Sequence, residues 1–306
     1  MGNILSKGLL WAYDFAASGD APMRLWDLNT DKVIATFVPE HPENSTYGNG
    51  RGVAFDPSDG FIWTTRVTGV GGHGDGFIHK NNPLTGEEIL TILDPGGEGG
   101  PGIGALDVDP DDCTLWAAVY LPILKDDPET GQPILVSRFY NLNPRNGKVI
   151  KMIDIAFKGD PTIDGNDTLA IARPSNLGGK KVILSDAGEI RNELFAVDVH
   201  TGKILETYSL PVGVSGIDED ENTGDLIVSD VFNNFYNLGP APYNTIKGVL
   251  DNLSHAVEDI SLNQPRKCKG KGHDSSGNHE SSGSHGSSGS NGSSGKRNRK
   301  RKSKKD

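Results

Sequence analysis

Short runs of alternating apolar and polar residues begin at Leu9 and continue along most of the chain, and turns rich in Gly, Asn and Asp separate them. Alternation with a period of two residues indicates strands with one buried face, and these turn residues are typical of strand ends. One such run recurs five times, at residues 9–14, 61–66, 114–119, 182–187 and 226–231. The pattern predicts an all-β, repetitive protein.

Each run belongs to a larger unit. A second strand, a turn and a short apolar third strand follow it, and one further strand precedes it. Three of the turns place Gly just before Lys or Glu, at Gly86, Gly147 and Gly202, which favours a sharp reversal. The preceding strand is found at residues 52–57, 104–110, 169–174, 215–220 and 255–260.

The fifth preceding strand lies near residue 255, whereas the run that it should precede lies at residues 9–14. Pairing of these two segments would close a ring. We therefore predict a β-propeller of about five four-stranded blades over residues 8–262, each about 50 residues long. A β-helix or two stacked sandwiches would leave the displaced strand unexplained. Residues 38–51, 67–76, 120–137 and 157–167 are interpreted as insertions.

The repeat resembles the NHL, YVTN and streptogramin-lyase-like group of β-propellers, whose blades run G-[IV]-A-[VF]-D, [LIV]-[WY]-V-[ST]-D and T-G-[KE]. In this chain residues 52–56 and 201–203 carry the first and last motifs, and residues 226–230 resemble the second, with Ile227 at the aromatic position. The resemblance covers nearly the whole body and implies the propeller fold. It singles out no function, because such propellers include sensors, scaffolds, lyases and lactonases.

The headline net charge of −11 conceals two oppositely charged parts. Residues 266–306 carry 12 Lys and Arg against 3 Asp and Glu, which leaves 18 basic and 38 acidic residues in the body. The acidic body is not expected to bind nucleic acid, because phosphate contact needs clustered positive charge. We expect residues 263–306 to form a disordered Ser/Gly/His-rich and polybasic tail. The tail would contact nucleic acid or an anionic membrane, or act only as a solubilising end.

Features of targeting and redox chemistry are sparse. Cys113 and Cys268 provide no disulfide framework and no metal spacing, and a bridge between them is not expected. No apolar run is long enough for a transmembrane segment, and residues 1–19 lack the core of a secretory signal. We therefore predict a soluble, intracellular protein. Gly2 fits a myristoylation pattern, so the tail and Gly2 together allow a nuclear or membrane-peripheral location.

Ligand sites of propellers lie on loops at one face of the axial channel, because a rigid ring presents those loops. The loop at residues 69–76 adds one histidine and one acid among five glycines, and a mobile hairpin loop is its alternative interpretation. The predicted ligand-binding residues at this face are Asp14, Arg66, His73, Asp75 and Asn233.

Carboxylates predominate at this face, and crowded carboxylates favour a hard cation such as Ca²⁺. Asp186 and Asp230 end the same strand pattern in successive units, where three other units have Tyr13, Thr65 and Ala118. The predicted metal ligands are therefore Asp186 and Asp230. Solvated or structurally paired aspartates are the competing interpretation.

At this position the chain resembles the metal-dependent lactonases of the regucalcin type, which place an Asp at the strand end as a metal ligand. Asp230 is the matching residue. The chain departs from that family at Ser215, where an Asn is expected, and it lacks the Glu of an E-G-P motif. No His and Glu pair matches the streptogramin lyases.

Two functions of different class remain. The first is a non-enzymatic binding or scaffold protein that takes an unknown protein or small-molecule ligand at the acidic channel face. The second is a divalent-metal-dependent lactonase or lyase of the regucalcin or streptogramin-lyase type. The recurring tryptophans Trp11, Trp63 and Trp116 are expected to pack between blades rather than to stack on a ligand.

Overall fold

The fold was analysed in a computed structural model of the chain. It describes residues 8–14, 21–39, 49–67, 73–156, 166–186, 192–220, 222–230, 234–250 and 257–262. The chain divides into two units, Met1–Lys271 and Gly272–Asp306, and all described residues belong to the first. Gly2, the loop residues 69–72 and the tail 263–306 lie outside the described residues, so the predictions about them stay predictions.

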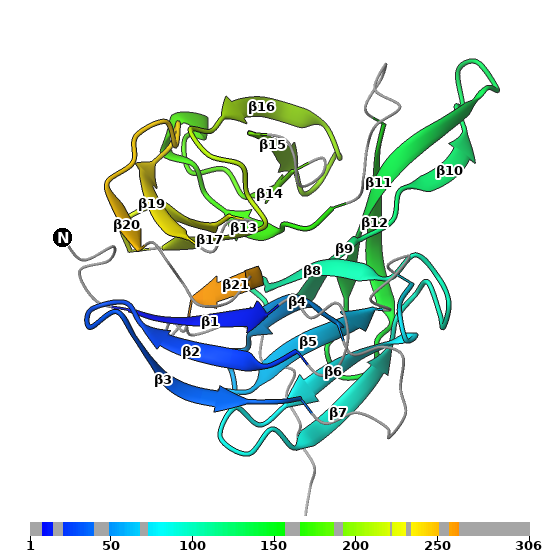
Figure 1. The fold of residues 1–306 in the computed structure, drawn as a ribbon. Coiled ribbons are helices and arrows are strands. Elements are labelled where there is room, and N and C mark those ends of the chain that lie inside the picture. Colours follow the sequence, from blue (N-terminus) through cyan, green and yellow to red (C-terminus); the bar gives the residue numbers. More distant parts are fainter. Residues whose placement is uncertain are drawn as a thin grey trace, which may run out of the picture. The chain divides into compact units, whose positions relative to one another are not determined.

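Five antiparallel sheets form the blades of a ring, which confirms the predicted fold class (Figure 1). Blade 1 contains β21 (Val257–Leu262), β1 (Leu9–Asp14), β2 (Met23–Asp27) and β3 (Lys32–Phe37). Blade 2 contains β4 (Asn49–Phe55), β5 (Ile62–Val67), β6 (Phe77–Asn81) and β7 (Glu88–Leu93). Blade 3 contains β8 (Ile103–Val108), β9 (Leu115–Val119), β10 (Ile123–Asp126), β11 (Pro133–Leu142) and β12 (Val149–Ala156).

The last two blades each hold four strands. Blade 4 contains β13 (Ala170–Ala172), β14 (Val182–Ser185), β15 (Glu193–Asp198) and β16 (Ile204–Ser209). Blade 5 contains β17 (Gly216–Asp220), β18 (Asp225–Ser229), β19 (Phe235–Pro240) and β20 (Gly248–Leu250). The helical structure in the described part is one 3-10 turn, Ser175–Leu177, and no described helix is long and apolar enough to cross a membrane.

The two ends of the described chain meet in blade 1. β1 pairs antiparallel with β21, and Leu10 lies opposite Leu262 while Ala12 lies opposite Ile260. In Figure 1 the orange strand β21 lies beside the dark blue strand β1. The predicted ring closure is therefore confirmed.

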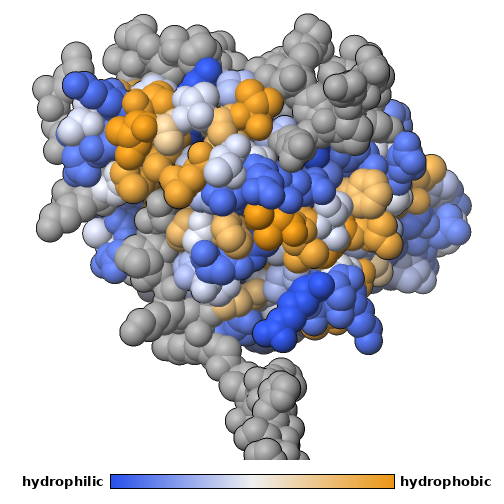
Figure 2. Space-filling view, turned by 90° about the horizontal axis from the view of Figure 1, so that it is seen from below, coloured by the Kyte–Doolittle hydropathy of each residue, from blue (hydrophilic) through white to orange (hydrophobic). Residues whose placement is uncertain are grey.

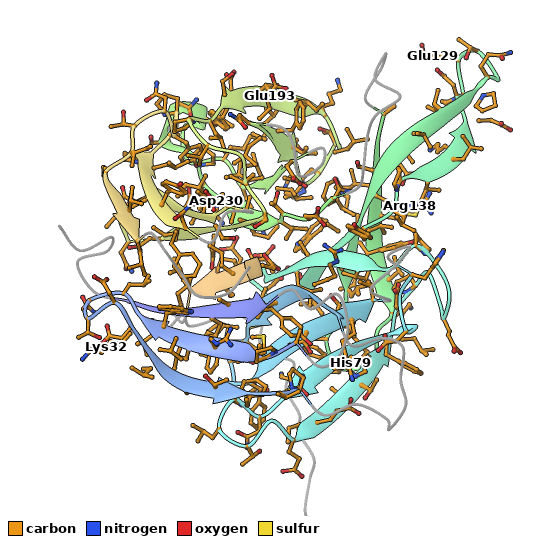
Figure 3. The ribbon with its side chains drawn as sticks, in the orientation of Figure 1. Lys32, His79, Glu129, Arg138, Glu193 and Asp230 are labelled. Carbon is orange, nitrogen blue, oxygen red and sulfur yellow. The ribbon has the colours of Figure 1, made fainter. Side chains whose placement is uncertain are left out.

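Blade 3 differs from the predicted four-stranded plan. Residues 120–137, interpreted as a loop insertion, instead supply β10 and a long first half of β11. β10 pairs with that half, from Ile123 opposite Val136 to Asp126 opposite Pro133. The insertion reverses direction at a turn between the two strands, where Gly131 has a left-handed backbone (φ 69°) and its N donates to Asp127 O at 2.7 Å. The resulting hairpin extends beyond the blade, with Glu129 at its tip (Figure 3).

Polar side chains join neighbouring blades where the innermost strands meet. Asp259 of β21 accepts a hydrogen bond from Val53 N of β4 (2.8 Å), and Asp107 of β8 accepts one from Ile171 N of β13 (2.6 Å). Asp218 of β17 accepts one from Leu262 N of β21 (2.7 Å). Each carboxylate satisfies a buried backbone donor that has no strand partner on that side.

The tryptophans are core residues. Trp11, Trp63 and Trp116 are all buried, and each belongs to a different apolar cluster between adjacent sheets. Aliphatic side chains are also exposed on the outermost strands, among them Ile34 on β3 and Ile150 on β12. Figure 2 shows such hydrophobic surface interrupted by hydrophilic side chains.

One cysteine differs from the expectation. Cys113, in the turn between β8 and β9, is disulfide-bonded, whereas the spacing of the two cysteines gave no reason to expect a bridge. The sequence contains one other cysteine, Cys268, and it lies outside the described residues.

Candidate functional site

The strand pairing defines one face of the ring, which we call the mouth face. β4, β8, β13, β17 and β21 begin there, and the strands paired with them, β5, β9, β14, β18 and β1, end there. It is the face on which the sequence placed the ligand and metal residues.

Three blades meet at Arg51 of the mouth face. Its guanidinium Nη1 lies 3.5 Å from Asp167 Oδ1, and Nη2 donates a hydrogen bond to the Tyr120 hydroxyl at 3.2 Å. The guanidinium carbon also lies 4.3 Å from the centre of the Tyr120 ring. Arg51 is on β4, Tyr120 follows β9 and Asp167 precedes β13. An arginine buried to this degree (6 % exposed) is stabilised by such pairing.

Asp186 follows β14 on the same face and is buried, with 1 % of its surface exposed. Thr168 donates to its Oδ1 from both the backbone N (3.3 Å) and the hydroxyl (3.0 Å). The other oxygen, Oδ2, is buried and has no hydrogen-bond partner among the described residues. Burial raises the pKa of Asp186 to about 7, although the donors from Thr168 oppose this shift. The side chain therefore holds a proton under mildly acidic conditions.

Asp230 directly follows β18 in blade 5 (Figure 3), and both of its carboxylate oxygens accept hydrogen bonds. Asn234 donates from its backbone N to Oδ1 and from its side-chain amide to Oδ2, both at 2.9 Å. The Tyr236 hydroxyl donates to Oδ2 at 2.9 Å. In the described part of the chain, no group of three or more His, Cys, Asp or Glu side chains is arranged to hold a metal ion.

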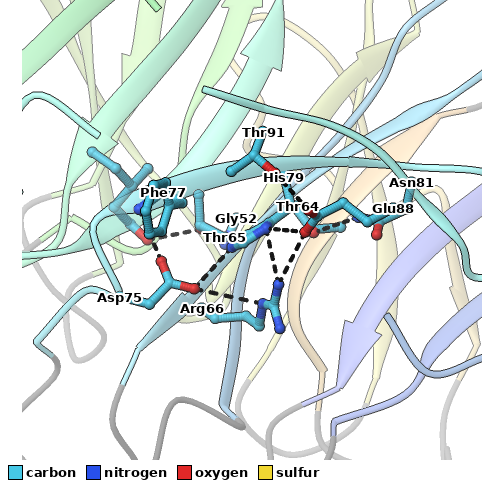
Figure 4. A network of polar contacts seen from close by, with 11 residues as sticks. Gly52, Thr64, Thr65, Arg66, Asp75, Phe77, His79, Asn81, Glu88 and Thr91 are labelled. Atoms are coloured by element: carbon cyan, nitrogen blue, oxygen red, sulfur yellow. Dashed lines mark hydrogen bonds and ion pairs between the residues drawn. The ribbon is translucent and has the colours of Figure 1, made fainter. Parts of the chain in front are cut away.

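The structure joins two of the predicted ligand residues, Arg66 and Asp75, through a histidine that the sequence analysis did not single out (Figure 4). His79 Nε2 lies 2.8 Å from Asp75 Oδ2, and His79 Nδ1 lies 2.6 Å from Glu88 Oε2. Arg66 Nε lies 3.7 Å from Asp75 Oδ2, and its Nη2 lies 3.7 Å from Glu88 Oε2. We call Arg66, Asp75, His79 and Glu88 the His79 network.

Asp94 lies close to this network. Gly96 N donates to its Oδ1 at 2.7 Å. Burial raises the pKa of Asp94 to about 6, the Gly96 donor opposes this, and the nearby charge of Asp75 adds to it.

The structure describes the other three predicted ligand residues in less detail. His73 is exposed, and its Nδ1 lies 3.2 Å from Gly100 O, in the connection between blades 2 and 3. Asp14 ends β1 opposite Val257, and its side chain is not among those described. Asn233 lies outside the described residues.

Sequence reasoning gave Tyr120, Thr168, His79 and Glu88 no role. Tyr120 directly follows a strand end at the mouth face, which is a signal that an alignment of the repeats could have used. His79 and Glu88 lie inside strands, where the alternation predicts burial but not the partner.

Comparisons with known proteins show no family for this chain. No family model matches the chain, and no curated protein matches it. A solved protein of unknown function from Bacteroides caccae shares 11 % identity with a TM-score of 0.50, over 84 % of this chain and 99 % of that one. Glutaminyl cyclase from Myxococcus xanthus shares 12 % identity with a TM-score of 0.47, over 82 % of this chain and 85 % of that one.

The WD40 β-propeller domain of Doa1 shares 15 % identity with a TM-score of 0.45, over 85 % of this chain and 87 % of that one. At such low identities a likeness concerns the fold alone. The resemblance to the NHL, YVTN and regucalcin groups stays a prediction. By its own strand pairing, the chain is a five-bladed β-propeller.

Proposed function

We propose that the chain is a non-enzymatic binding or scaffold protein that takes its ligand at the mouth face. Propellers present loops on a rigid ring, and such loops commonly carry binding sites. The proposal leaves open whether the ligand is a protein or a small molecule.

One observation carries this proposal. Side chains from three blades meet at the mouth face, where the buried Arg51 contacts the buried Asp167 and the partly buried Tyr120. Asp186 adjoins this group through Thr168, the residue after Asp167, whose backbone N and hydroxyl both donate to Asp186 Oδ1. The pairing of Arg51 with Asp167 offsets the cost of burying the two charges, but a buried ion pair adds little net stability compared with apolar packing. A binding role therefore explains this buried polar group better than stability alone does.

The test is a screen of the purified chain against libraries of metabolites and peptides by thermal shift. A ligand that binds the native state raises the melting temperature, and at 100 times Kd it adds about 2.7 kcal/mol to the unfolding free energy. We expect Arg51→Gln to abolish the shift. Arg145→Gln, an exposed arginine in the turn between β11 and β12, is the matched control. Equal shifts in both variants would place the ligand elsewhere.

A metal-dependent lactonase or lyase is the second candidate. It is favoured by Asp186 Oδ2, a buried carboxylate oxygen for which the described part of the chain provides no hydrogen-bond partner and which a divalent ion such as Ca²⁺ would satisfy. Asp230 would have to release Asn234 or Tyr236 to share that ion. Addition of Ca²⁺, Mg²⁺ or Zn²⁺ should then raise the melting temperature, and Asp230→Asn should reduce the effect. An unchanged melting temperature with all three ions would exclude this candidate.

A further inference from the structure

We propose that the His79 network is a pH-sensitive latch, which fastens the outer hairpin of blade 2 to β5 while His79 is protonated and loosens it when His79 loses its proton. The latch goes beyond the proposed function, because it concerns the pH-dependent stability of blade 2 and not the binding of a ligand.

The geometry requires a charged imidazole in the fastened state. Each ring nitrogen of His79 lies within hydrogen-bond distance of a different carboxylate, Asp75 at 2.8 Å and Glu88 at 2.6 Å. A carboxylate accepts and cannot donate, so both ring nitrogens must carry hydrogen. Only the imidazolium satisfies both contacts.

The same geometry contains a second arrangement. Arg66 Nη2 lies 2.9 Å from His79 Nδ1, and a guanidinium can only donate. This contact is a hydrogen bond when Nδ1 is unprotonated, and it sets two donors against each other when Nδ1 carries hydrogen. Arg66 and Glu88 therefore compete for the same ring nitrogen, and the protonation state of His79 decides between them.

Loss of the proton leaves one carboxylate without its partner. Neutral His79 keeps its Nε2–H on Asp75 and accepts from Arg66 at Nδ1. Glu88 then retains the Thr91 hydroxyl, which donates to its Oε1 at 2.6 Å, and the long contact to Arg66. Because a third of the Glu88 side chain is already exposed, the released carboxylate can turn to solvent. β7, which begins at Glu88, then loses its short contact with His79 and keeps the long contact with Arg66.

The charges that face His79 set the direction of the response. Arg66 faces it from β5, Asp75 from the segment just before β6 and Glu88 from β7. The charge of Asp75 also acts on the buried Asp94. Burial lowers the pKa of His79, but the hydrogen bonds to Asp75 and Glu88 outweigh this and raise it above 6.5. The stabilisation is therefore fully present below pH 6.5 and is lost as the pH rises through the raised value.

The latch lies next to the mouth face. Arg66 is paired with Gly50 in the β4–β5 ladder, and Gly50 directly precedes Arg51. A change in the contacts of Arg66 therefore takes place directly across the strand ladder from the residue that precedes Arg51, the arginine that contacts Tyr120 and Asp167.

The test follows the histidine and the hairpin by NMR on the full chain, without any ligand. We expect the His79 ring signals to titrate above pH 6.5. We also expect the amide protection factors of β6 and β7, corrected for intrinsic exchange, to fall with the same midpoint. Glu88→Gln should lower the midpoint by about 1 unit or more, because a neutral amide holds the imidazolium less strongly. Glu129→Gln, an exposed glutamate at the tip of the β10–β11 hairpin, is the control and should leave it unchanged.

Three results would overturn the latch. They are a His79 midpoint at or below 6.5, a midpoint that Glu88→Gln does not move, and protection in β7 that does not change through the titration. Should Glu88→Gln fail to fold, the wild-type titration and its β7 protection decide the question. None of these readouts involves a ligand, so they stand or fall independently of the binding proposal.

Discussion

Asp186 shows how a single residue couples the mouth face to pH. Burial raises its pKa to about 7, so the folded protein binds this proton more tightly than the unfolded chain does. The group's contribution to stability is then fully present below its ordinary value near 4 and is lost as the pH rises through about 7. Ionised Asp186 destabilises the fold at alkaline pH because Oδ2 has no donor.

We therefore predict that the unfolding free energy of Asp186→Asn, relative to that of the wild type, is greater at pH 8 than at pH 5. Asparagine keeps an acceptor for Thr168 and never ionises, so this difference should increase by about 1 kcal/mol or more between the two pH values. Urea unfolding at the two pH values measures it, and Asp112→Asn, an exposed aspartate in the β8–β9 turn, is the control. A difference that is the same at both pH values would contradict the raised pKa.

His79 illustrates what residue patterns leave out. The alternation of apolar and polar residues in β6 indicates on which face of the strand its side chain lies, and not which side chains it contacts there. The sequence does not say that Arg66 and Glu88 lie against it. Those contacts arise because β5 and β7 flank β6 in the folded blade.

At the scale of elements, the turns were predicted well. Gly86, Gly147 and Gly202 all have a positive φ between 69° and 77°, as the Gly-Lys and Gly-Glu pattern indicated. Glycine adopts this conformation without the steric cost that other residues meet. The β10–β11 hairpin was missed because the sequence pattern of residues 120–137 does not distinguish an extra hairpin from a loop.

The hydrogen bonds between innermost strands carry a prediction at this scale. Asp107→Ala removes the acceptor of Ile171 N and leaves a buried donor unsatisfied, which costs about 1–3 kcal/mol. Chemical denaturation measures the loss, and Asp126→Ala, at an exposed aspartate of β10, should change stability by less than about 0.5 kcal/mol. Equal losses in the two variants would mean that the contact between blades 3 and 4 does not depend on this carboxylate.

At the scale of the whole molecule, the ring depends on the pairing of β1 with β21. Truncation after residue 256 removes β21, the acceptor Asp259 and the partner of β1, so we predict loss of the cooperative unfolding transition. Truncation after Lys271 keeps the first structural unit and should preserve the transition. Circular dichroism during thermal unfolding compares the two. A cooperative transition in the shorter chain would show that the ring does not need its closing strand.

The sequence by itself determined the strands, the sharp turns, the five-fold repeat and the meeting of Leu9–Asp14 with Val257–Leu262. These follow from preferences of neighbouring residues, repeated along the chain, and from one strand that has no local partner. Only the tertiary structure decided which side chains meet at the mouth face. Arg51 and Asp167 are 116 positions apart, and their contact depends on how blades 2, 3 and 4 pack. The pKa of Asp186 and the partners of His79 likewise depend on burial and on distances between strands, which local patterns do not specify.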